Sequence, residues 1–181
     1  MLFNKLAFAL LFLVGITFSK LQPRNSVSSH AYTKNVIELQ TGFNKVFYTI
    51  GTDFNQVLIY CRNSKLSDVI AYFSRVHSSV SALSSRCIIG FKYHDLAFRF
   101  SNYFFQILIK LQGALIVISQ YRKMIIGCRG LFVSISVHLN HIIKYMNKAN
   151  VDVLGMGRYY SRHINFNLFN LLGFSLNLDA Y

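Results

Sequence analysis

The chain has 181 residues, 53% of them hydrophobic, which is enough to bury a sizeable core in one ordinary domain plus an appendage. It carries 19 Lys and Arg against 6 Asp and Glu, a net charge of +13. This charge is unusual for a soluble enzyme that acts on small anions. It indicates a polyanionic partner, either nucleic acid or an anionic membrane. The three cysteines are widely spaced without a CxxC pair, which indicates neither a zinc site nor a disulfide framework, so we expect Cys61, Cys87 and Cys128 to be small core residues.

Residues 1–36 have the composition of a targeting segment. Lys5 precedes an apolar run at residues 6–18, which matches a signal-peptide core and is shorter than the ~20 residues that span a bilayer. The residues that follow are basic and rich in Ser and Thr, as in an organellar transit peptide, and the first acidic residue is Glu38. A signal followed by a transit peptide predicts a plastid, and a mitochondrial presequence is the nearest competitor. The alternative is a protein of the secretory pathway.

Residues 37–100 form a basic region whose pattern leaves the fold open. Residues 45–50 and 56–61 are interpreted as a hairpin around Gly51, and residues 66–76 as a helix. We expect a lineage-specific extension that packs on neighbouring proteins. A separate small domain of unrelated role is the alternative.

Residues 101–181 have a more regular pattern, which predicts strands and helices in the order β-β-β-α-β-α-β. The expected strands are residues 104–111, 114–119, 124–126, 151–154 and 174–178, and the expected helices are residues 134–148 and 160–172. Gln112-Gly113 marks a tight hairpin turn, and Gly173 stands where a left-handed helix cap is expected. The predicted fold class is therefore α/β, with a mixed sheet.

The run VDVLGMGR, followed by a helix and LLGFSLNLD, resembles the C-terminal half of the small-subunit ribosomal protein eleven family. The hairpin ILIKLQGALIVIS resembles that family's first two strands, so the resemblance covers residues 104–181. It implies a ribonuclease-H-like fold with a basic N-terminal extension. The chain departs from the family's pattern at Val153 and Tyr159 and lacks the family's basic C-terminal tail.

The resemblance implies a structural constituent of an organellar small ribosomal subunit that binds ribosomal RNA in translation. Its expected partners are ribosomal RNA, neighbouring small-subunit ribosomal proteins, and messenger RNA near the exit side. The alternative is a secreted or membrane-associated basic protein that binds lipid headgroups or a protein partner.

The RNA-binding residues that we expect lie on turns at the edge of the sheet. They are Arg122, Lys123, Arg129, Gly155, Gly157, Arg158 and Arg162. In the 155–158 loop, glycines would let backbone amides approach a phosphate at the start of the next helix. The alternative is a plain strand-to-helix turn beside a solvated basic surface.

Catalysis is not expected, because the sequence has a single Glu and its aspartates are scattered, with Asp152 and Asp179 too isolated to bind catalytic metal ions. We predict no catalytic residue, no metal and no cofactor. His138 and His141 are three residues apart on a helix, which suits two metal ligands, but no third ligand is identifiable and a surface pair is expected.

Overall fold

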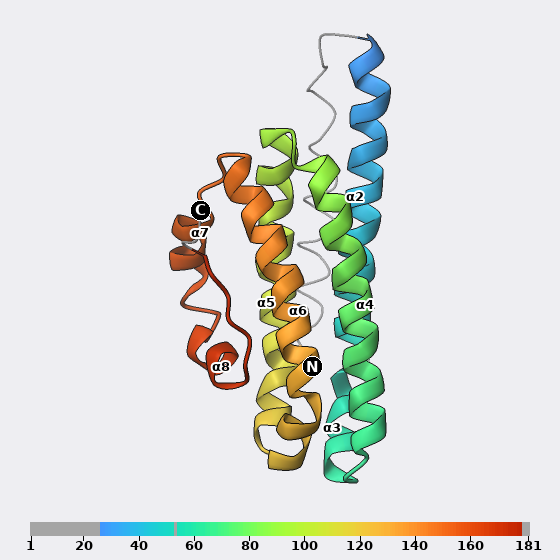
Figure 1. The fold of residues 1–181 in the computed structure, drawn as a ribbon, viewed down its shortest axis with the longest axis vertical. Coiled ribbons are helices and arrows are strands. Elements are labelled where there is room, and N and C mark those ends of the chain that lie inside the picture. The colour runs from blue at the N-terminus through green and yellow to red at the C-terminus, as the bar shows by residue number, and fades with distance from the viewer. Residues whose placement is uncertain (1–25, 53, 179–181) are drawn as a thin grey trace, which may run out of the picture. The chain divides into compact units, whose positions relative to one another are not determined.

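The computed structural model describes residues 26–52 and 54–178, and every regular element in them is an α-helix (Figure 1). The helices are α2 (Ser26–Thr52), α3 (Phe54–Arg62), α4 (Leu66–Gly90), α5 (His94–Ser119), α6 (Arg122–Lys148), α7 (Val153–Tyr160) and α8 (Phe166–Leu171). The described residues form no β-strand, so the predicted α/β class with a mixed sheet is wrong. The apolar run of the predicted leader and Asp179 lie outside the described residues.

The chain forms two compact units, residues 1–33 and residues 34–181. The described part of the first unit is the start of α2, where the Thr33 hydroxyl donates a hydrogen bond to the Ser29 carbonyl (2.8 Å). The second unit contains the rest of α2 and all the other helices. The boundary expected between residues 100 and 101 falls inside α5.

In the second unit, α4 packs closely against α6, and the two helices run in the same direction (Figure 1). Leu66 lies beside Gly127, and His77 lies beside His138, so both pairs are 61 positions apart in the sequence. A constant offset of this kind defines a parallel register. Consequently α4 and α6 begin at the same end of the bundle.

Helix α5 covers both runs predicted as the first hairpin, and Gln112-Gly113 lies inside this helix. Its buried residues recur at intervals of three and four, as in Phe100, Phe104, Ile107, Leu108, Leu111, Leu115 and Ile118. Helices α3, α4, α6, α7 and α8 all pack against α5. Between residues 104 and 119 the polar residues are Gln106, Lys110, Gln112 and Ser119. With so few polar positions, a short apolar run cannot be distinguished from a buried strand.

Other predicted elements are partly correct. The helix expected at residues 66–76 begins at Leu66 as predicted but continues to Gly90. The helix expected at residues 134–148 is the second half of α6, whose first half includes the run predicted as a third strand. The hairpin expected at residues 45–61 is wrong, because these residues form the end of α2 and α3.

The C-terminal segment folds back along α5 and α6. Gly173 has a φ of +91°, and the Phe174 N–H donates to the Phe169 carbonyl (2.8 Å), which confirms the left-handed cap. The strand expected at residues 174–178 is instead an irregular segment held by Asn140 of α6. The amide of Asn140 donates to the Ser175 carbonyl (2.6 Å) and accepts from the Asn177 N–H (2.9 Å).

Candidate functional site

Four exposed basic side chains gather at the end of the bundle where α4 and α6 begin. Arg62 and Lys65 lie at the turn between α3 and α4, and Arg122 and Lys123 open α6. Figure 1 shows both turns at the same end, as the parallel register of α4 and α6 requires. We call this group of four residues the positive end.

The N-termini of α4 and α6 lie at the positive end, beside the C-termini of α3 and α5. Their N-cap residues, Lys65 and Tyr121, make no side-chain capping hydrogen bond. The first turn of a helix has N–H groups without intrahelical partners, and they amount to about half a positive charge. Asp68 lies half-buried in the first turn of α4, whereas α6 has no acidic residue in its first turn. The opposite partial charges of the two C-termini offset those of the two N-termini, so the positive end attracts anions through its four side chains.

The structure separates the predicted RNA-binding residues into two groups. Arg122 and Lys123 belong to the positive end, and exposed Arg129 lies two turns further along α6. The remaining predicted residues lie in or just after α7, where Tyr160 stacks on Phe105 at 4.8 Å between ring centroids. Helix α5 ends beside the positive end, and Phe105 lies about 20 Å before that end at 1.5 Å per residue. The residues at α7 are therefore too far from the positive end to form one site with it.

The predicted glycine-rich loop is part of helix α7. A carboxylate oxygen of Asp152 accepts from the Gly155 N–H (2.8 Å), so the start of this helix is capped by the chain's own side chain. A Cβ on Gly155 would overlap that carboxylate, and a Cβ on Gly157 would lie 2.6 Å from the Leu178 side chain. Packing explains both glycines, and the strand-to-helix phosphate loop is wrong. RNA contact by exposed Arg158 and Arg162 stays a prediction.

The sequence did not show that a third histidine joins His138 and His141. His77 of α4 lies 5.2 Å from His138 between ring centroids, and His141 lies 6.2 Å from His138. No sequence signal could have found His77, because the offset of 61 positions between α4 and α6 exists only in the folded bundle. Within residues 26–52 and 54–178, no three His, Cys, Asp or Glu side chains are arranged to hold a metal ion.

Cys61, Cys87 and Cys128 are buried and unpaired, as expected of core residues. Burial raises the pKa of all three thiols, and burial together with the neighbouring Cys61 raises the pKa of Cys128 to about 11. A thiol with a raised pKa stays protonated near neutral pH and is a poor nucleophile or metal ligand.

No protein-family model, curated protein or solved structure matches this chain. The resemblance to the ribosomal protein eleven family therefore depends on the residues quoted above, and the sheet that it implies is absent from the described residues.

Proposed function

We propose that the protein is a non-catalytic RNA-binding component of an organellar small ribosomal subunit. The observation that carries the proposal is the positive end, where four exposed cations lie at one end of the bundle, namely Arg62, Lys65, Arg122 and Lys123. Backbone phosphates are the ligands that such a group of cations attracts, and contacts of this kind position a protein on RNA without base-specific chemistry.

The distribution of charge over the bundle supports folded RNA as the partner. Exposed cations occur on several helices, including Lys45 on α2, Arg75 on α4, Arg129 on α6 and Arg158 on α7. A membrane surface contacts one face of a protein, whereas folded RNA can surround the protein. In ribosomal assembly, cations on several faces would neutralise different RNA segments.

Assignment of the protein to an organellar ribosome is more specific than RNA binding and has its own support. It depends on the transit-like composition of the first 36 residues and on the excess of basic over acidic residues. It makes no use of the ribonuclease-H-like fold or of the glycine-rich loop. The non-catalytic role is supported by the described carboxylates, since Asp68, Asp95 and Asp152 lie at the starts of three different helices.

The experiment that tests this proposal is sedimentation of the tagged protein in a sucrose gradient of organelle lysate, with and without magnesium chelation. We expect the protein to sediment with small-subunit ribosomal RNA and to shift when chelation dissociates the particle. Recovery only in light fractions or only in membrane fractions would contradict the proposal.

An anionic membrane is a second candidate partner, because exposed isoleucines lie one turn from the positive end. Ile126 is 67% exposed, and Ile59 and Ile116 are each 46% exposed. Cations beside exposed apolar side chains suit a bilayer interface. Two helices, α5 and α6, are also long and apolar enough to cross a membrane by length and composition alone, with mean hydropathies of 1.3 and 1.2.

Vesicle flotation distinguishes the two partners. If the membrane is the partner, the protein floats with phosphatidylserine-containing vesicles, and Ile126→Ser reduces this binding while Ile88→Ser, a similarly exposed site on α4, does not. If RNA is the partner, Ile126→Ser leaves RNA binding unchanged and excess RNA removes the protein from the vesicles.

A further inference from the structure

A second basic feature lies on the side of the bundle, between α2 and α4. The two helices run antiparallel, with Leu39 beside Gly90 and the Thr49 Oγ1 3.3 Å from the Ser79 Oγ. Around this hydroxyl pair the surface forms a groove of about 630 Å³. That volume is within the range of small-molecule sites, about 300–1,000 Å³.

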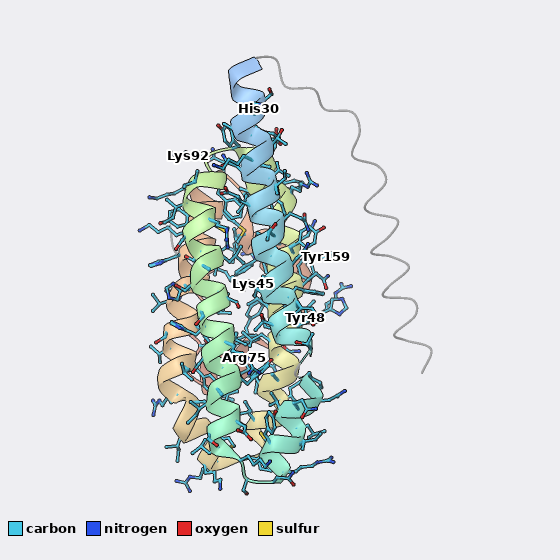
Figure 2. All side chains as sticks on the ribbon, turned by 90° about the vertical axis from the view of Figure 1, so that its right-hand side faces the viewer. His30, Lys45, Tyr48, Arg75, Lys92 and Tyr159 are labelled. Carbon is cyan, nitrogen blue, oxygen red and sulfur yellow. The ribbon has the colours of Figure 1, made fainter. Side chains whose placement is uncertain are left out.

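Cations flank the groove from opposite ends. Lys45 lies one turn from Thr49 on α2, and Arg75 lies one turn from Ser79 on α4, with both side chains exposed on the same side of the bundle (Figure 2). Because the helices are antiparallel, these two residues are about 12 Å apart along the helix axis. The two cations suit the groove to an anion.

The hydroxyl groups of the groove provide mainly acceptors. Thr52 Oγ1 donates to the Tyr48 carbonyl (2.9 Å) and Ser78 Oγ donates to the Ser74 carbonyl (3.0 Å), so both protons are already used within the helices. Each hydroxyl oxygen can still accept a hydrogen bond. A ligand with hydroxyl donors of its own, such as a ribose, complements these acceptors.

An aromatic ring completes the lining. The Tyr48 side chain is 71% exposed beside the groove, on the same helix as Lys45 (Figure 2). Exposed tyrosines stack on unpaired bases, and a cation nearby holds the attached phosphate. Phosphate, ribose and base would each find a complementary group here.

We propose that this groove binds one nucleotide, with its phosphate held by Lys45 and its base stacked on Tyr48. A free mononucleotide and an unpaired nucleotide of RNA present the same chemistry. Binding of an RNA nucleotide rests on the proposed RNA-binding function, whereas binding of a free mononucleotide does not.

The test is isothermal titration of the full protein with AMP and with inorganic phosphate, together with anisotropy of a fluorescein-labelled A10 RNA. AMP should bind more tightly than phosphate. Tyr48→Ala should lower the affinity for AMP about tenfold, as expected for loss of base stacking, and Tyr48→Phe should retain it. Lys45→Ala should weaken binding of both anions and reduce the salt dependence of RNA binding by about one phosphate contact.

Matched controls come from the same kinds of side chain elsewhere. Tyr159→Ala removes a tyrosine that is 74% exposed on α7, and Lys92→Ala removes an exposed lysine between α4 and α5 (Figure 2). Neither should change AMP affinity. Equal affinities for AMP and phosphate, or equal losses in the groove and control variants, would overturn the proposal.

The two proposals fail separately. If groove variants lose AMP binding while the protein binds no RNA, the groove serves a free nucleotide and the proposed RNA-binding function fails. If RNA binding depends on the positive end while AMP does not bind and groove variants behave like the wild type, the nucleotide groove is overturned alone.

Discussion

The pKa of His138 depends on the packing of α4 against α6. Burial, and then the positive charges of His77 and His141, lower its pKa below the ordinary value of 6.5. The charged groups of the neighbouring helices offer little compensation, because Asp68 is nine residues before His77, about 14 Å along α4. Asp95 and Asp152 lie at the starts of α5 and α7. The other charged residues of α4 and α6 are Arg75, Arg86, Arg122, Lys123, Arg129, Lys144 and Lys148, all cationic.

A pH dependence of stability follows from His138. Its folded-state pKa is lowered, so the unfolded chain binds more protons, and the stabilisation present above pH 6.5 is lost as pH falls through the folded value. One whole proton is worth about 1.4 kcal/mol per pH unit, and partial exposure reduces the effect to a fraction of that. Urea unfolding between pH 7 and pH 5 should show a smaller loss for His138→Gln than for wild type. His163→Gln, an exposed histidine elsewhere, should behave like the wild type. Equal pH dependence in all three proteins would contradict the assignment.

Helices in this chain were predictable where one side of the helix faces solvent. The second half of α6 and the start of α4 alternate buried and exposed positions, and the Gly173 cap was visible because left-handed backbone favours glycine. Helix α5 was not predicted, because polar residues are sparse between residues 104 and 119 and an apolar residue, Ile116, also occupies an exposed position there. At α7, Gly155, Gly157 and Arg158 resembled a phosphate-binding loop, although the carboxylate of Asp152 caps the start of this helix.

The candidate sites were predictable to a smaller extent. Arg122 and Lys123 were expected to lie on a turn, and they do lie beside one, but Arg62 and Lys65 join them only through the packing of α3 and α4. The groove at Lys45, Tyr48 and Arg75 depends on two antiparallel helices distant in sequence. Local pattern cannot reveal neighbours that only the tertiary register creates.

The close approach of α2 and α4 at Gly90 predicts how glycine substitutions change the stability of the protein. Gly90 is buried at the end of α4, and a Cβ there would lie 2.9 Å from Leu39 Cγ, whereas a Cβ on Gly130 of α6 would meet nothing within 4 Å. Gly90→Ala should therefore destabilise the protein by about 1–3 kcal/mol through overpacking. Gly130→Ala should stabilise it by up to about 1 kcal/mol, because alanine favours the helix. Thermal unfolding of the two variants checks both signs, and a stabilising Gly90→Ala would refute the close α2–α4 contact.

At the scale of the whole molecule, charged side chains make the two ends of the bundle electrostatically different. Four exposed cations lie at the positive end, where the described carboxylate, Asp68, is half-buried. At the opposite end, Lys92 and Lys148 are followed within four residues by the exposed carboxylates of Asp95 and Asp152. Equal numbers of basic side chains should therefore attract phosphate unequally at the two ends.

The most direct test of this account is the salt dependence of binding to purified small-subunit ribosomal RNA. The double variant Arg122→Ala/Lys123→Ala removes two cations from the positive end, and Lys92→Ala/Lys148→Ala removes two from the opposite end. Each phosphate contact contributes about 0.7–0.9 to the slope of log affinity against log salt. We expect the slope to fall by roughly 1.4–1.8 in the first variant and to stay unchanged in the second. Equal changes in both variants, or an unchanged slope in the first, would contradict RNA binding by the positive end.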